Sequence, residues 1–130
     1  MLRVKLPHVP EWIELVRAAA QEYTRQLSVL PGIITPWESP EALHVYHQYT
    51  LRIEQGRRNE ARQFLADAGI GTMVHYPYPL HRLPVYSESA FVLPEAEKAV
   101  QEVLSLPIWP LISRETINAV AAALKSWVNK

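Results

Sequence analysis

The segment from Gly69 to Tyr86 restricts the possible folds more than any other part of the chain. It reads GIGTMVHYPYPLHRLPVY and contains Pro77, Pro79 and Pro84. Each proline fixes its own φ and disfavours a helical conformation in the residue before it, so we expect an ordered, non-helical loop. The loop lines a binding site or, in the simpler interpretation, is a rigid connection whose rings pack on the domain. Five polar rings lie in this stiff frame: His75, Tyr76, Tyr78, His81 and Tyr86.

Length and composition narrow the class of protein. A chain of 130 residues predicts one domain with a sizeable core. Thirteen basic and thirteen acidic residues leave no net charge and no basic stripe, which argues against nucleic-acid binding. The sequence has no cysteine for a disulfide or a thiolate metal site, and no apolar run of about 18 residues for a membrane span. Because no signal peptide is recognisable, we expect a cytoplasmic protein.

Hydrophobic periodicity and helix end signals predict four helices. The first spans about 10–28, with Pro10 in its first turn, and follows an extended lead-in at residues 1–9. A short helix from Asn59 to Ala68 ends at Gly69, which we expect in a left-handed conformation. A third helix begins at Pro94, and Ser113 caps the last helix.

Three strands are predicted between these helices. The segment 44–53 alternates with period two and is rich in residues that favour strands. We expect a second strand at 72–76 and a short third strand at 105–108. Few strands and several helices indicate an α/β, two-layer fold (α+β in the stricter sense), with a small sheet and helices packed on one face. The order of the strands is not defined by this pattern.

The residues that could bind a metal do not form a convincing site. His44 and His47 would point to opposite faces of the predicted strand, so they could not bind one ion. His75 and His81 could meet across the loop, but no carboxylate lies close to them in sequence. We therefore expect no metal site.

Catalytic groups are also incomplete. The chain lacks a Gly-x-Ser-x-Gly motif, and the Glu95/Glu97 pair is explained by the positive end of a helix. A lysine that forms a Schiff base needs a desolvated pocket, and the lysines lie at chain ends or on predicted helix surfaces. The residues alone therefore indicate a loop typical of a site without a complete set of reacting groups.

Five motifs identify a resemblance that runs through nearly the whole chain. They are LRVKLPHVPEW from Leu2, LPG from Leu30, HVYHQY from His44, the GIGTMVHYPYPLHRLPVY segment and LPEAEKAVQEVLSLPIWPLIS from Leu93. In this order and spacing they resemble the C-terminal small domain of the DegT/DnrJ/EryC1/StrS aminotransferases. That family consists of fold type I, pyridoxal-phosphate-dependent enzymes that aminate keto-sugars attached to nucleotides.

The resemblance implies an architecture and a set of site residues. It implies a single domain over 1–130, with an interdomain-type long helix at 1–30 and a lobe at 43–130 whose small sheet is mainly antiparallel. Members of the family are usually dimers that hold the cofactor between their large and small domains and the partner subunit. By position, His75, Tyr76 and His81 would face substrate or cofactor. His44 and Tyr46 match the other small-domain motif and are further candidates for the cleft.

The chain also departs from the family pattern, and these departures bear on its function. The family's large domain, which carries the Schiff-base lysine, the acid that pairs with the pyridinium nitrogen and the phosphate anchors, has no counterpart in this sequence. Trp109 stands where family members often have His, and the stretch between Tyr86 and Leu93 looks shortened. We therefore expect no catalytic residue in this chain, no pyridoxal phosphate bound by this chain alone, and no transamination by this polypeptide alone.

Three hypotheses about function follow from the resemblance. The chain is a detached or truncated small domain without independent catalysis, one half of a split aminotransferase that works with a separate large-domain subunit, or a binding or regulatory module that reuses the lobe. We also expect self-association, as a homodimer, through the first helix or the uncovered inner face. The apolar residues of that helix are Trp12, Ile13, Leu15 and Val16.

Overall fold

The computed structural model of the chain describes residues 2–86 and 91–130. At its centre is a three-stranded antiparallel sheet of β1 (Ile33–Ile34), β2 (Tyr49–Ile53) and β3 (Val103–Leu106), in the order β1-β2-β3. In the β2–β3 register, Tyr49 lies opposite Leu106 and Leu51 lies opposite Leu104. The expected α/β fold with a small antiparallel sheet is confirmed.

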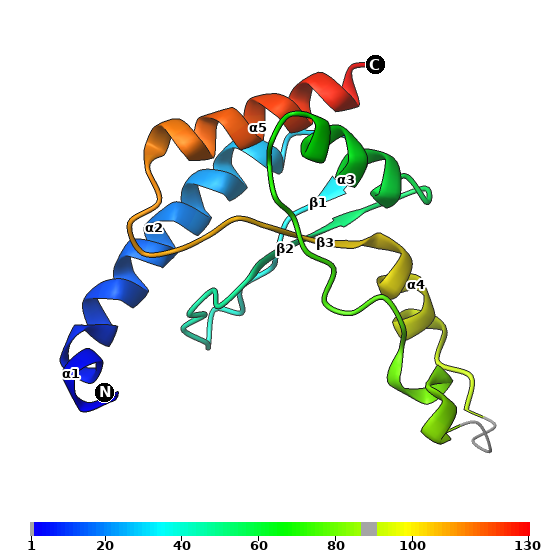
Figure 1. Cartoon of the computed structure of the whole chain (residues 1–130), viewed down its shortest axis with the longest axis horizontal. Helices are drawn as coiled ribbons and strands as arrows, with labels where there is room; N and C mark the ends of the chain where they lie inside the picture. The colour runs from blue at the N-terminus through cyan, green and yellow to red at the C-terminus, as the bar shows by residue number, and fades with distance from the viewer. Residues whose placement is uncertain (1, 87–90) are drawn as a thin grey trace.

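Helices cover one side of this sheet. Figure 1 shows α2 and α5 running side by side above the strands, with α3 next to them, while α4 and the loop before it project away from this body. The longer helices are α2 (Val9–Leu27), α3 (Arg58–Asp67), α4 (Pro94–Glu102) and α5 (Arg114–Val128). The short ones are α1 (Leu2–Lys5) and the 3-10 turns η1 (Leu6–His8), η2 (Leu80–Arg82) and η3 (Pro84–Tyr86).

The core forms where the apolar stripes of α2 and α5 meet the inner face of β2. Alternate residues of β2 are buried, as period two predicts, and Tyr49 reaches α2, where its hydroxyl lies 2.8 Å from the Thr24 hydroxyl. The Tyr23 hydroxyl donates to the Pro107 carbonyl at 3.0 Å. Both buried rings therefore have hydrogen-bond partners, and burial raises the pKa of Tyr49 to about 12.

Several predicted element ends are confirmed. Gly69 has φ +75° and follows α3, as expected for a left-handed residue after a helix. The Ser113 hydroxyl accepts a hydrogen bond from the Thr116 N–H at 3.2 Å and caps α5. Helix α3 begins at Arg58, one residue before the predicted start at Asn59.

Other predictions were wrong for identifiable reasons. The lead-in at 1–9 is helical over α1 and η1 rather than extended, since Pro7 falls in the first turn of η1, where a proline is compatible with helix. The predicted strand 44–53 begins only at Tyr49, because Tyr46 has φ +44° and turns the chain before the sheet. The predicted strand 72–76 is reduced to one bridge between Met73 and Ser105.

Arg58 joins α3 to the end of α4 from a buried position. Only 7% of its surface is exposed, and its guanidinium donates to the carbonyls of Val100 and Val103, each at 3.2 Å. These carbonyls lie at the C-terminal end of α4, where a cation is favourable. Burial, with a smaller contribution from Arg62, lowers the pKa of Arg58, so this contact replaces lost hydration.

We predict that Arg58→Ala destabilises the fold by about 2–3 kcal/mol, because the carbonyls of Val100 and Val103 lose a charged donor that lies buried between α3 and α4. Arg62→Ala is the matched control on the same helix, since Arg62 is exposed, and it should change stability by less than about 0.5 kcal/mol. Urea unfolding of both variants measures the difference. Equal stability of the two variants would show that Arg58 does not hold α4 in place.

Candidate functional site

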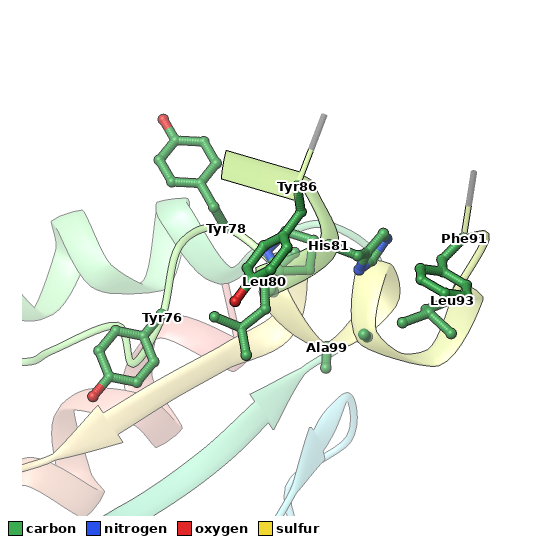
Figure 2. A pocket seen from close by; sticks show the side chains of 11 residues that line it. Tyr76, Tyr78, Leu80, His81, Tyr86, Phe91, Leu93 and Ala99 are labelled. Carbon is green, nitrogen blue, oxygen red and sulfur yellow. The ribbon is translucent and has the colours of Figure 1, made fainter. Parts of the chain in front are cut away.

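A groove of about 550 Å³ lies between the proline-rich loop and α4. Its lining is almost entirely apolar and aromatic. Figure 2 shows Tyr76 toward one end of the groove and Phe91 with Leu93 toward the other. Most of the rings come from a loop with three prolines, which restrict the backbone that carries these side chains. The lining residues are Tyr76, Tyr78, Pro79, Leu80, His81, Tyr86, Phe91, Leu93, Ala96, Ala99 and Val100.

A polar cluster ties this loop to α4. The Oε1 atom of Glu97 lies 2.9 Å from His81 Nε2 and accepts from Arg82 at 3.1 Å (Nε) and 2.7 Å (terminal nitrogen). His81 is 8% exposed, so its imidazole is part of the wall rather than of an open surface. The hydrogen bonds from His81 and Arg82 lower the pKa of Glu97 and keep it ionised.

Two further hollows lie beside the sheet. One, of about 240 Å³, is lined by His75, His47, Gln48 and Trp109 among others. The other, of about 450 Å³, runs along α2 past Trp12 and is also lined by His47 and Trp109. Trp109 is 45% exposed and lines both hollows, so its indole is accessible from either.

His44 and Tyr46 belong to a network that holds the 35–48 segment on α2. Glu38 Oε1 accepts from Arg17 at 2.6 Å and from the His44 N–H at 2.8 Å, and Glu38 Oε2 accepts from the Tyr46 hydroxyl at 3.2 Å. The Tyr46 N–H donates to His44 Nδ1 at 2.8 Å, which leaves the proton of a neutral imidazole on Nε2. Arg17, followed by the backbone N–H of His44, lowers the pKa of Glu38 to about 2.

The five candidate residues therefore lie in three places. His81 and Tyr76 line the groove by α4, and His75 lines the smaller hollow beside the sheet. The His44 ring lies against the Tyr46 ring in a tilted arrangement, with ring centroids 4.2 Å apart. The expectation of a shortened stretch between Tyr86 and Leu93 falls largely on residues 87–90, which lie outside the described residues.

Sequence reasoning missed the two carboxylates that organise these places. Glu97 was assigned to the helix dipole, which its position in the first turn of α4 also permits. Glu38 was overlooked because it lies in a linker without periodicity. No signal in the chain links Glu38 to Arg17 or Glu97 to His81, since each pair is separated by 16 residues or more.

The described residues do not fit a complete pyridoxal phosphate site. All four lysines of the chain are exposed, and none lines the three hollows. The chemistry of the cofactor requires a lysine in a desolvated pocket. Among residues 2–86 and 91–130, no three His, Asp or Glu side chains lie close enough to share a metal ion. Within the same ranges, no helix is both long and apolar enough to cross a bilayer.

A three-stranded antiparallel sheet covered by helices on one side, with a proline-rich aromatic loop at its edge, defines a small α/β lobe. The chain belongs to the DegT/DnrJ/EryC1/StrS aminotransferase family, whose model matches residues 1–125. Enzymes of this family depend on pyridoxal phosphate.

Individual relatives support this assignment. A pleiotropic regulatory protein of Geobacillus stearothermophilus is 45% identical over 88% of this chain and 32% of that protein. The dTDP-3-amino-3,4,6-trideoxy-alpha-D-glucose transaminase of Streptomyces venezuelae is 39% identical over the whole chain and 35% of that enzyme. The crystal structure of S. venezuelae DesV in complex with a ketimine intermediate superposes with a TM-score of 0.93 at 39% identity, over 99% of this chain and 35% of that one. The chain thus spans about a third of the length of these relatives.

We predict that acid weakens the fold through Glu38. The pKa of its carboxyl is about 2 in the folded chain against an ordinary value of 4.5, so the stability it contributes is present above pH 4.5 and is lost as the pH falls toward 2. Glu38→Gln should be less stable at pH 7 and should lose less stability on acidification. Chemical unfolding across this pH range measures both effects, with Glu41→Gln, an exposed neighbour, as the control. Parallel acid profiles of the parent chain and Glu38→Gln would contradict the assignment.

Proposed function

We propose that this chain forms the small-domain wall of a nucleotide-sugar aminotransferase site and does not catalyse transamination by itself. A large domain, in the same polypeptide or in another, would supply the lysine and hold the cofactor. The observation that carries the proposal is the 39% identity and the TM-score of 0.93 to DesV over the whole lobe, together with four lysines that are all exposed.

Within this wall, we assign His75, Tyr76 and His81 to the face that meets substrate or cofactor, with His44 and Tyr46 at a second position of the cleft. His75 lines a hollow with polar groups, and Tyr76 is 73% exposed beside the apolar groove. These two side chains are accessible and are therefore the better candidates for direct contact. His81 and Tyr46 are buried and hydrogen bonded, so their contribution would be to hold the wall in shape.

A binding or regulatory role is the second candidate. The relative with 45% identity is named a pleiotropic regulatory protein, and another relative, 40% identical over 97% of this chain, is named a sensory transduction protein, EryC1. In that role the hollows around Trp109 would bind a ligand without a reaction. Binding of a nucleotide sugar to the chain alone, measured by tryptophan fluorescence, would favour this role.

We predict that the purified chain remains colourless with pyridoxal phosphate and transfers no amine, because its exposed lysines lie outside any desolvated pocket. Addition of a large domain from a family member should restore bound cofactor colour and amino transfer. Absorbance and a coupled transamination assay measure the two results. Amino transfer by the chain alone would contradict the proposal, whereas failure with several large domains would favour the binding role.

In such a reconstituted enzyme, His75→Ala or Tyr76→Ala should lower kcat/KM by about tenfold or more, the usual effect of losing a positioned polar contact. His8→Ala is the matched control, because His8 is exposed on η1 and lines none of the hollows described above. Equal activities for all three variants would remove His75 and Tyr76 from the site.

We also propose that the chain self-associates through apolar side chains near its first long helix. Leu2, Val4 and Leu6 are largely exposed, whereas Val16, which we expected in this surface, is buried in the core. Light scattering at micromolar concentration should give the mass of a dimer, and Leu2→Ser combined with Leu6→Ser should shift it toward the monomer, since exposed apolar area drives association. A monomeric mass for the parent chain would exclude this surface as an interface.

A further inference from the structure

One oxygen atom of Glu97 is shared by His81 and Arg82, two side chains of the proline-rich loop at residues 76–86, which we call the aromatic loop. The Oε1 atom receives His81 Nε2 at 2.9 Å and two nitrogens of Arg82 at 3.1 and 2.7 Å. The His81 imidazole is buried, while the Arg82 guanidinium reaches the Glu97 carboxylate from a half-exposed position. A buried imidazole without a partner would be costly, so this arrangement requires the carboxylate.

The rest of the loop has little else to fix its direction. Its backbone hydrogen bonds close turns within the loop itself: Arg82 to Pro79, Leu83 to Leu80 and Tyr86 to Leu83. In the described parts of the chain, the bonds to Glu97 are the only hydrogen bonds that join residues 76–86 to another element. Apolar contacts in the groove are non-directional and allow the rings to slide. Charge-assisted hydrogen bonds have a defined geometry and do not allow such sliding.

We propose that Glu97 is a positioning residue, which holds the aromatic loop on α4 and so sets where Tyr76 and its neighbouring rings stand. The inference rests on the proposed function only in taking this loop as a wall of the site. It differs from the helix-dipole explanation, because Glu95 lies in the same first turn of α4 and has no side-chain hydrogen bond among the described residues. A dipole contribution would be shared by both carboxylates, whereas the loop contact belongs to Glu97 alone.

The test compares Glu97→Gln with Glu95→Gln in the chain alone, by NMR. In Glu97→Gln we expect the amide protons of Arg82, Leu83 and Tyr86 to exchange about tenfold faster, since local opening of the loop becomes easier. The downfield imidazole N–H signal of His81 bonded to a carboxylate should disappear. In Glu95→Gln both observations should match the parent chain, and in both variants the amides of β2 and β3 should be unchanged.

Two more variants keep the inference testable if Glu97→Gln folds poorly. Arg82→Gln removes the guanidinium and leaves His81, so its exchange rates should lie between those of the parent and Glu97→Gln. Glu97→Asp keeps the carboxylate and should restore part of the protection and the imidazole signal. Equal exchange in Glu97→Gln and Glu95→Gln, or an Arg82→Gln variant identical to the parent, would overturn the inference.

These measurements need neither cofactor nor large domain, so their outcome is independent of whether the chain serves an aminotransferase. In a reconstituted enzyme, the positioning role predicts that Glu97→Gln raises KM for the sugar substrate by about tenfold while kcat changes less, because the wall and not the reacting groups is displaced. A fall in kcat with KM unchanged would instead assign Glu97 to the chemistry and would overturn the positioning role.

Discussion

The lobe depends on the burial of β2 between two strands and beneath two helices. Tyr49, Leu51 and Ile53 present the inner face of this five-residue strand to α2 and α5, and each is almost completely buried. A short sheet alone would be marginal in water, and the helices remove its apolar face from solvent. Helix α3 packs on α5 and β3, and α4 contacts β2, so both helices are positioned by this core.

Around that core, carboxylates hold the irregular segments. Glu38 binds Arg17 and fastens the segment that carries His44 and Tyr46, and Glu97 binds His81 and Arg82 and fastens the aromatic loop. In both cases a loop without a regular backbone ladder is attached to a helix by one acidic side chain. Among the candidate site residues, His44, Tyr46 and His81 hydrogen bond directly to one of these two carboxylates.

The match to the DegT/DnrJ/EryC1/StrS family and the exposure of all four lysines both support the proposed division of roles between this lobe and a large domain. The lobe supplies rings, imidazoles and an apolar groove, which are groups that bind and orient. It does not supply a desolvated lysine, which the chemistry of the cofactor requires. In the proposed function the rings of this loop must stand in a defined place, and the hydrogen bonds to Glu97 are the contacts that would fix that place.

The sequence by itself determined the four longer helices, the left-handed Gly69, the Ser113 cap, the two-layer class and the family, because these depend on local periodicity, end signals and motif order. Only the tertiary structure decided that the predicted strand at 44–53 shortens to Tyr49–Ile53, that His75 and His81 line different hollows, and that Glu38 and Glu97 have cationic partners. These outcomes arise from contacts between residues far apart in the chain, such as Arg17 with Glu38. No local pattern encodes such contacts, since their energy exists only after the core has brought the two segments together.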